Sequence, residues 1–425
     1  MSSDPVDFFT SVAAAHRRCF WLDGGGAREW SGRRSIIGWL DDDDVSLSFS
    51  AARGEVTRHV GATSEVVGDD VFAVLESELR PGEQWFGYLG HASRTDLPAA
   101  PDPLLPDAVW MRPRGVRVFD HPVGGGPSGS VQRSPADRGS LNLSGSARPD
   151  KFSERPTTQY AAAFARVQEH LHAGNSYEVN LTHRVAVEDD LDPVTAYLRL
   201  RALNPAPYAG FLQHDVDGAR AWLLSSSPER YALVTPDRHL ETKPIKGTTP
   251  RGATPAEDRA ERERLATDPK TRAENLMIVD LLRNDLSLVC EVGTVAVPAL
   301  MQVESYESVH QLVSTVRGRL RDDVSTVAAL RALFPAGSMT GAPKLRTMEI
   351  IEEVESTPRG VYAGAFGWIS GDGPADLGVV IRSLVTDGSG TWCLGTGGGI
   401  TVRSDVDEEW AEAGWKAERL LRVFD

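Results

Sequence analysis

Cysteine is scarce, and long apolar runs are absent. The three cysteines, Cys19, Cys290 and Cys393, lie far apart in the 425 residues, and none belongs to a Cys-x-x-Cys pair. This excludes a disulfide-stapled fold or a zinc ribbon, and we expect three small buried side chains. No segment approaches the roughly 18 apolar residues of a membrane span, so no membrane partner is expected. The N-terminal stretch has no basic segment followed by a long apolar one, so we expect a cytoplasmic protein.

Basic residues are fewer than acidic residues, and few of the basic residues are lysines. Lys and Arg number 45 against 60 Asp and Glu, giving a net charge of −15, so we expect no nucleic-acid partner. Only six of the basic residues are Lys. Arg cannot readily lose its proton, whereas a desolvated Lys can become a nucleophile. Lys246, Lys344 and Lys416 lie in dense motifs and are candidates for such work, whereas Lys151 and Lys270 have the polar surroundings of ordinary surface residues.

The apolar pattern predicts strands and helices without a regular β-α-β alternation, which favours an α+β fold. Short runs and period-two alternation predict strands at 20–22, 35–40, 45–50, 179–187, 361–370, 377–385 and 391–397. Helical spacing predicts helices that begin at 157, 274, 348 and 407. The expected organisation is an N-terminal α+β part at 1–120, a Gly-, Ser- and Pro-rich linker at 121–156 and a catalytic domain at 157–425.

Nucleotide loops, metalloprotease motifs, EF-hand loops and serine-nucleophile elbows are all absent from the sequence. In the last helix, Glu409, Glu412 and Lys416 share one face. This pattern is typical of a solvated ion pair, but together with Glu274 on another helix it would also suit Mg²⁺. The cluster GTGGGI at 395–400 indicates either a tight turn or a close approach to an anion.

Nine motifs occur in one order along the chain. They are SSSPERY (225–231), PIKGT (244–248), ENLMIVDLLRND (274–285), VHQLVSTVRG (309–318), FPAGSMTGAPKLRTMEIIEEVE (334–355), RGVYAGAFGWIS (359–370), VVIRS (379–383), GTGGGI (395–400) and the ExxExxxK helix. Together they resemble the chorismate-utilising enzymes, which include anthranilate, aminodeoxychorismate, isochorismate and salicylate synthases. The resemblance covers roughly 157–422 and implies large antiparallel β-sheets packed as a two-layer sandwich flanked by helices.

The resemblance also implies a substrate site. Mg²⁺ would be held by Glu274 and Glu412, with Glu409 beside them, and would bind one carboxylate of chorismate. The remaining substrate contacts would come from Arg382, Lys416, Tyr362, Thr340, Gly397, Gly398, Gly399 and His310. In many members a histidine follows one place later than His310, where this chain has Gln311.

Two positions favour one branch of this family. Lys246 in PIKGT resembles the nucleophilic lysine of aminodeoxychorismate synthases, where anthranilate synthases typically carry Ala. It would attack ring carbon C2, with Glu229 assisting departure of the C4 hydroxyl, and burial beside a cation would lower its pKa. Glu178 aligns near the water-activating lysine of isochorismate and salicylate synthases, and this disfavours water as the nucleophile.

The expected activity is therefore that of the synthase component of 4-amino-4-deoxychorismate synthase. No glutaminase segment is recognisable, so ammonia would come from a separate glutamine amidotransferase subunit. The alternatives are anthranilate synthase component I, an aminodeoxyisochorismate synthase, or a non-catalytic subunit. The sequence leaves open whether the product serves folate or antibiotic synthesis.

Overall fold

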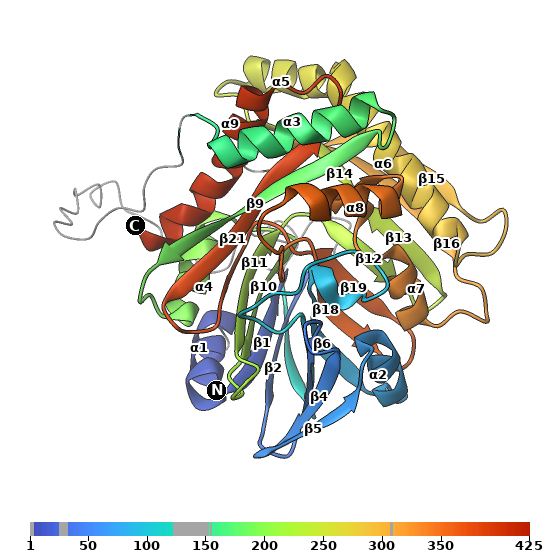
Figure 1. The fold of residues 1–425 in the computed structure, drawn as a ribbon. Coiled ribbons are helices and arrows are strands. Elements are labelled where there is room, and N and C mark those ends of the chain that lie inside the picture. Colours follow the sequence, from blue (N-terminus) through green and yellow to red (C-terminus); the bar gives the residue numbers. More distant parts are fainter. Residues whose placement is uncertain (1–3, 25–32, 122–152, 154, 307–308) are drawn as a thin grey trace.

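The structure is a computed structural model of the whole chain. It describes residues 4–24, 33–121, 153, 155–306 and 309–425. The predicted linker lies almost wholly outside this part of the chain. Two large antiparallel sheets form the centre of the molecule, and helices cover their outer faces (Figure 1). This confirms the predicted α+β sandwich.

The smaller sheet has nine strands among the described residues. In spatial order they are β17 (Gly341–Ala342), β9 (Glu178–Glu188), β21 (Thr391–Ile400), β20 (Ser383–Thr386), β11 (Ala221–Ser227), β10 (Tyr208–His214), β1 (Arg18–Asp23), β2 (Arg34–Leu40) and β8 (Val116–Asp120). Strands from the beginning and the end of the chain thus share one sheet. The longest ladder joins β9 to β21 over ten residue pairs, from Glu188 opposite Thr391 to Val179 opposite Ile400.

The larger sheet has twelve strands within the described ranges. In spatial order they are β14 (Ile245–Pro250), β16 (Val309–Arg319), β13 (His239–Lys243), β12 (Arg230–Val234), β19 (Ala375–Val379), β18 (Ala365–Ser370), β6 (Gln84–Leu89), β7 (Ala108–Arg112), β3 (Val45–Ser50), β4 (Glu55–Val60) and β5 (Thr63–Gly68), with β15 (Ala296–Ser305) paired to β16. Strands that precede residue 121 therefore complete this sheet as well.

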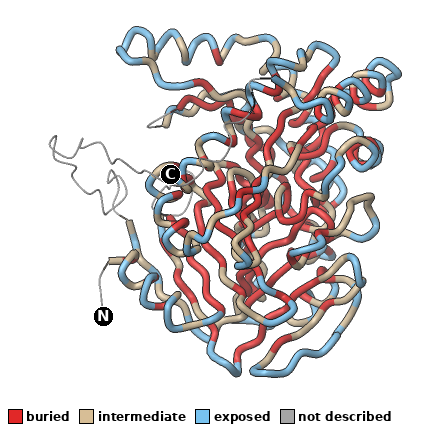
Figure 2. Tube along the Cα trace, turned by 60° about the vertical axis from the view of Figure 1, so that its left-hand side comes forward, coloured by how far each residue is buried: buried red, intermediate tan, exposed pale blue. Residues whose placement is uncertain are grey.

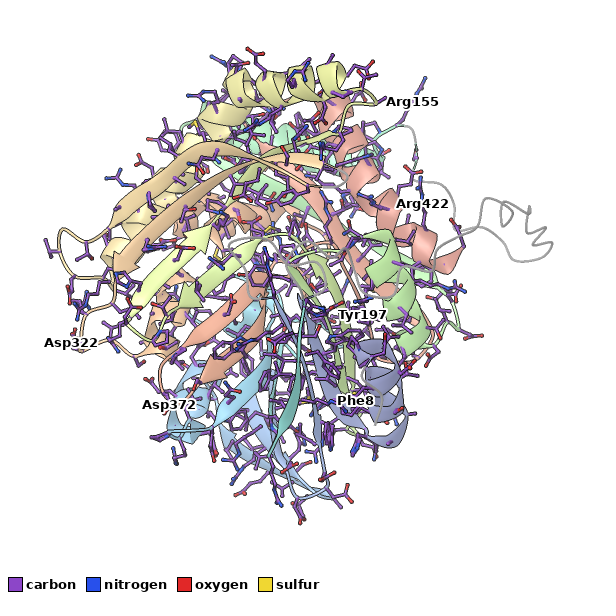
Figure 3. The ribbon with its side chains drawn as sticks, turned by 180° about the vertical axis from the view of Figure 1, so that it is seen from behind. Phe8, Arg155, Tyr197, Asp322, Asp372 and Arg422 are labelled. Carbon is purple, nitrogen blue, oxygen red and sulfur yellow. The ribbon has the colours of Figure 1, made fainter. Side chains whose placement is uncertain are left out.

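The helices lie outside the two sheets. They are α1 (Pro5–Ala15), α2 (Val71–Glu78), α3 (Thr158–His172), α4 (Pro193–Leu203), α5 (Pro255–Thr267), α6 (Pro269–Ser287), α7 (Thr326–Leu333), α8 (Lys344–Val354) and α9 (Val406–Leu421). Helices α1, α4 and α9 pack on the nine-stranded sheet, where the labels of Figure 3 mark Phe8 and Tyr197. Helix α6 packs against β16 of the twelve-stranded sheet. Within the described ranges, no helix is both long and apolar enough to cross a membrane.

Apolar side chains from both sheets form a core between them. Phe20 of β1 stacks on Phe86 of β6 with 4.1 Å between the ring centroids, and Leu212, Leu223 and Phe366 belong to the same cluster. Figure 2 shows buried residues concentrated along the strands and exposed residues on the outer helices and loops. Strands such as β1, β3 and β11 are buried on both faces, because each sheet packs against the other sheet on one side and against helices or further strands on the other.

One predicted strand is wrong in an informative way. The run at 377–385 is not continuous: β19 ends at Val379 in one sheet, and β20 begins at Ser383 in the other. Between them, Arg382 has a φ of 51°, a left-handed conformation that interrupts the extended backbone. The chain crosses between the sheets at this point. The predicted strand at 361–370 likewise begins only at Ala365, because its first residues form a turn that carries Tyr362.

Candidate active site

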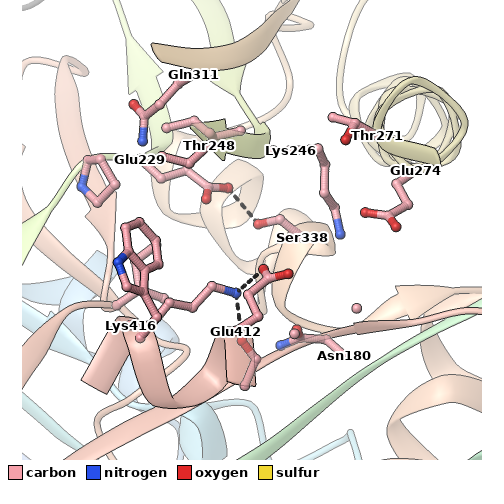
Figure 4. A pocket seen from close by; sticks show the side chains of 18 of the residues that line it. Asn180, Glu229, Lys246, Thr248, Thr271, Glu274, Gln311, Ser338, Glu412 and Lys416 are labelled. Carbon is pink, nitrogen blue, oxygen red and sulfur yellow. Dashed lines mark hydrogen bonds and ion pairs between the residues drawn. The ribbon is translucent and has the colours of Figure 1, made fainter. Parts of the chain in front are cut away.

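A cavity of about 390 Å³ opens between β14, β21, α6 and α9. Its lining includes residues from nearly every motif that the sequence analysis singled out: Glu229, Lys246, Glu274, Tyr362, Arg382, Gly397, Gly398, Gly399, Glu409, Glu412 and Lys416. Figure 4 shows several of these side chains converging on one space from different elements. The lining is rich in charge of both signs, as a site for a charged ligand requires.

Lys246 lies at the centre of this site. It projects from β14, is 9 % exposed, and forms an ion pair with Glu178 of β9. Burial by itself would lower the pKa of Lys246, but the carboxylates of Glu178, Glu274 and Glu229 together raise it above its ordinary value. Among the described residues the carboxylates therefore outweigh burial, and the effect of a neighbouring cation on this pKa stays a prediction.

Glu229 follows β11 on the opposite wall of the cavity. Its side chain is buried and accepts a hydrogen bond of 2.6 Å from Ser338 Oγ. Burial raises the pKa of Glu229 to about 7, although the Ser338 hydroxyl and Lys246 act against that rise. A carboxyl group with this pKa is half protonated near neutral pH, which suits a general acid.

Three glutamates come from two helices. Asp268 caps α6 by accepting a hydrogen bond from the backbone N–H of Thr271, and Glu274 follows one turn later. Burial raises the pKa of Glu274 to about 7. Helix α9 presents Glu409, which is 3 % exposed, and Glu412, whose pKa is lowered chiefly by Lys416, 2.8 Å away.

The glutamates fit a magnesium ion in their chemistry. Among the described residues, no three His, Cys, Asp or Glu side chains already form a metal-binding group. However, Oε1 of Glu274 is buried and has no hydrogen-bond partner in the described part of the chain. A buried carboxylate oxygen without a partner is costly unless a cation or water satisfies it. Carboxylate oxygens are also the ligands that Mg²⁺ prefers, and this ion commonly takes further ligands from substrate and water.

Positive charge gathers at another part of the cavity. The break between β19 and β20 carries Arg382, whose guanidinium lies 5.7 Å from the ring centroid of Trp415. No ion pair engages this guanidinium within the described ranges. Burial lowers the pKa of Arg382, as expected for a charge removed from water. Nearby, Lys416 donates a hydrogen bond of 2.8 Å to the carbonyl oxygen of Gly397. An anion entering here would meet two cations.

The three glycines lie within a strand, not in the turn that was one of the two expected forms. Gly397, Gly398 and Gly399 continue β21 and pair with β9. A Cβ atom at Gly399 would collide with the carboxylate of Glu178, and one at Gly398 would lie 3.1 Å from Oε2 of Glu409. The glycines therefore leave room on the strand for the two carboxylates that approach it.

Comparison with known proteins identifies the family of the chain. The model of the chorismate binding enzyme family matches residues 18–422. The chain belongs to this family. It is 39 % identical to an aminodeoxychorismate synthase of Streptomyces pristinaespiralis over 98 % of its own length, but it spans only 63 % of that relative. It is 35 % identical to anthranilate synthase component 1 of Streptomyces coelicolor, covering 89 % of this chain and 82 % of the relative.

A solved structure supports the same assignment. The fold matches anthranilate synthase component I from Streptococcus pneumoniae with a TM-score of 0.73 and 27 % identity, over 93 % of each chain. This likeness extends across both sheets, and so includes the N-terminal strands that the sequence motifs matched only loosely. The family assignment therefore rests on sequence and on fold together.

Two residues suggested by the family resemblance do not line the cavity. The Thr340 hydroxyl lies 3.3 Å from the carbonyl oxygen of Gly337, and its own carbonyl oxygen accepts a hydrogen bond from the backbone N–H of Asn180. His310 contacts Asp258 at 3.0 Å. Its neighbour Gln311 lines the cavity instead, because successive residues of a strand face opposite sides.

The sequence analysis missed three partners. Glu178 was noted only for the lysine it replaces, yet it pairs with Lys246. Ser338 holds Glu229, and Lys270, expected to be an ordinary surface residue, lines the cavity and lies 3.0 Å from Glu409. Lys270 lies one turn before Glu274 on α6, but the predicted helix began only at 274 and so left Lys270 outside it.

Proposed function

We propose that this chain is the synthase component of 4-amino-4-deoxychorismate synthase, which converts chorismate and ammonia to 4-amino-4-deoxychorismate and water. The observation that carries the proposal is the buried Lys246 in a cavity that also holds a carboxyl group with a pKa of about 7 and the unpaired guanidinium of Arg382. A lysine nucleophile, a general acid and an anion-binding group are the three parts that this reaction needs. The similarity to an aminodeoxychorismate synthase agrees with it.

In the first step, the amine of Lys246 forms a bond to C2 of the ring while the bond between C4 and its hydroxyl breaks. The proton carried by Glu229 goes to the departing hydroxyl, which leaves as water. Lys246 must first lose a proton, and the carboxylate of Glu178 in contact with it can accept that proton. Burial supports the step, because proton transfer within a desolvated pair creates no net charge.

In the second step, ammonia forms a bond to C4 while the bond between C2 and the lysine nitrogen breaks. The lysine leaves as a free amine and takes its proton back from Glu178. The new ammonium group at C4 returns a proton to Glu229. Atoms and charge then balance: chorismate and ammonia are consumed, and aminodeoxychorismate and water are formed.

The substrate is a dianion, and the cavity offers two kinds of site that would suit its two carboxylates. Arg382 and Lys416 would bind one of them. Glu274 and Glu412, with Glu409, would hold Mg²⁺, which when bound supplies positive charge for the other carboxylate. Tyr362, whose ring packs against Gly395, would support the ring. Ammonia would come from a glutamine amidotransferase partner.

Anthranilate synthase is the second candidate. This chain spans 82 % of the Streptomyces coelicolor anthranilate synthase component 1 but only 63 % of the aminodeoxychorismate synthase. The solved structural neighbour is also an anthranilate synthase component. The two reactions place nitrogen on different ring carbons, C2 for anthranilate and C4 for aminodeoxychorismate. They also differ in the loss of pyruvate. The identity of the product therefore separates them.

The deciding experiment incubates the purified chain with chorismate, MgCl₂ and an ammonium salt, and determines the mass and ring position of the product by mass spectrometry and NMR. We expect 4-amino-4-deoxychorismate from the native chain and almost none from Lys246→Ala. Anthranilate as the main product would favour the second candidate. Full activity in the alanine variant would remove the covalent step.

A further inference from the structure

Lys270 is the third lysine of the cavity, and it has no part in the reaction steps above. It is the second residue of α6, and its Nζ atom lies 3.0 Å from Oε1 of Glu409 on α9. The two partners differ in exposure: the Glu409 side chain is 3 % exposed and the Lys270 side chain 41 %. A buried carboxylate is thus neutralised by an ammonium group that reaches it from the rim of the cavity.

The carboxylates around Lys270 are those proposed for the metal. Burial would lower the pKa of Lys270, but Glu409, Glu274 and Glu412 together raise it. The other two lysines of the cavity have other partners: Lys246 pairs with Glu178, and Lys416 pairs with Glu412 and a backbone carbonyl. The three carboxylates that act on Lys270 are therefore the same three that would hold magnesium.

The contacts of Glu409 leave little room for a further cation on the same oxygen. Its Oε1 atom accepts hydrogen bonds from Lys270 and, at 2.7 Å, from Ser404. Its Oε2 atom faces Gly398 of β21. Meanwhile Oε1 of Glu274 is buried without a hydrogen-bond partner among the described residues. Two of the three proposed ligands are thus already engaged by lysines, Glu409 by Lys270 and Glu412 by Lys416, while Oε1 of Glu274 has no such partner among the described residues.

We propose that Lys270 is a built-in counter-ion for Glu409, which Mg²⁺ displaces when it binds. The lysine then swings toward solvent, as its exposure allows, and Ser404 remains on the carboxylate. Lys270 would thereby weaken metal binding in the absence of substrate and keep the buried carboxylate neutralised until the metal arrives. The identity of the ion rests on the proposed function, but the competition between lysine and metal does not need chorismate.

The test is Mg²⁺ binding to the full chain without substrate, measured by isothermal titration calorimetry and by the fluorescence of the nearby tryptophans Trp410 and Trp415. Removing a positive charge beside the carboxylates favours cation binding, so Lys270→Met is expected to bind Mg²⁺ about 5- to 50-fold more tightly. Lys270→Arg keeps the charge and should resemble the native chain. Arg283→Met removes the same charge from α6 at a solvent-exposed pair with Asp280 and should leave the affinity unchanged.

A double-mutant cycle with Glu409→Gln separates competition for this carboxylate from a general charge effect. If Lys270 acts by occupying Glu409, Lys270→Met should gain little affinity once Glu409 is an amide. An equal gain in both backgrounds would overturn the proposal, as would unchanged or weaker binding in Lys270→Met. Absence of Mg²⁺ binding in every variant would also overturn it.

Thermal denaturation gives an independent readout in each variant. Without metal, Lys270→Met leaves Glu409 without its ammonium partner, so we expect a lower Tm in EDTA and a larger rise in Tm on adding Mg²⁺ than in the native chain. Equal rises would contradict the proposal. If the metal behaves as expected but the product assay yields no aminated chorismate, the proposed function fails and this inference stands.

Discussion

Two lysines in this chain are buried to the same degree and have opposite electrostatics. The Lys246 side chain is 11 % exposed and the Lys344 side chain 12 %, and each forms an ion pair with a buried carboxylate, Glu178 and Asp285 respectively. Yet the pKa of Lys246 is raised, whereas that of Lys344 is lowered. Burial alone therefore does not decide the state of a lysine in this fold.

The difference lies in what else surrounds each pair. Lys344 donates to Asp285 at 2.7 Å and to the carbonyl oxygen of Leu333 at 2.8 Å, and Arg94 adds a repelling charge. It ties the start of α8 to α6 and to the end of α7, and it is not among the residues that line the active-site cavity. Lys246 faces a cavity and more carboxylates than it can contact. One lysine holds elements together, and the other is available to a ligand.

The largest effect is expected from replacing Lys246, because this lysine is the proposed nucleophile. Lys246→Arg keeps a positive charge for Glu178 but removes a nucleophile, because a guanidinium does not readily deprotonate. We expect kcat for chorismate amination to fall by roughly a thousandfold or more, while the Tm changes little. Steady-state kinetics with ammonium and a thermal melt test both parts. A fall in Tm with kcat preserved would make Lys246 the structural lysine.

The converse is expected for Lys344→Met. This change leaves Asp285 as a buried charge without its ammonium partner, which typically costs about 3–5 kcal/mol in the free energy of unfolding. Activity per folded molecule should stay within a fewfold of the native value, since Lys344 does not line the cavity. Urea denaturation and active-site-normalised kinetics are the measurements. Loss of kcat without loss of stability would erase the distinction between the two lysines.

Glu178→Gln sharpens the comparison by making the surroundings of Lys246 resemble those of Lys344. Glu178 is the strongest influence that raises the pKa of Lys246, so the amide should lower that pKa by about one unit or more. A free amine is needed for attack, so the acid limb of the pH–kcat profile should move to lower pH, while the maximal kcat falls because the amide cannot accept the proton of Lys246. Glu304→Gln, which removes the partner of Lys243, is the matched control and should leave the limb in place.

The smallest effect concerns the general acid. The Ser338 hydroxyl lowers the pKa of Glu229, which burial has raised to about 7. Without this hydrogen bond, in Ser338→Ala, the pKa should rise by about half a unit. A general acid must be protonated, so activity is lost as pH rises through its pKa, and the basic limb of the profile should move upward. A limb that moves downward would contradict the role of Glu229.

Local pattern was sufficient for most elements of the fold. Period-two alternation located β3 at Val45–Ser50, and helical spacing located the start of α3, which the structure caps with Thr157. It failed at 377–385, because a strand that leaves one sheet for the other keeps its apolar residues. Only the left-handed Arg382 marks the crossing, and no composition signal announces such a residue.

The residues that line the site could be predicted from the sequence, but the pairs that they form could not. Motifs pointed to most of the side chains that line the cavity, because chemistry of this kind uses a small set of residue types. The pairings were beyond reach: Glu178 and Lys246 are 68 positions apart in sequence, and Lys270 and Glu409 are 139 apart. Whether a lysine is charged depends on these distant neighbours. The direction of the pKa shift of Lys246 follows from such neighbours.

The register between β9 and β21 determines which residues of β21 face the active site. Side chains alternate between the two faces of a strand, so deleting a single residue of β21 between Trp392 and Gly398 would turn every following position to the opposite face. Ile400 would then take the place of Gly399, where a Cβ atom collides with the carboxylate of Glu178. The spacing of a whole strand, and not any one side chain, thus determines whether the carboxylate and the lysine can meet.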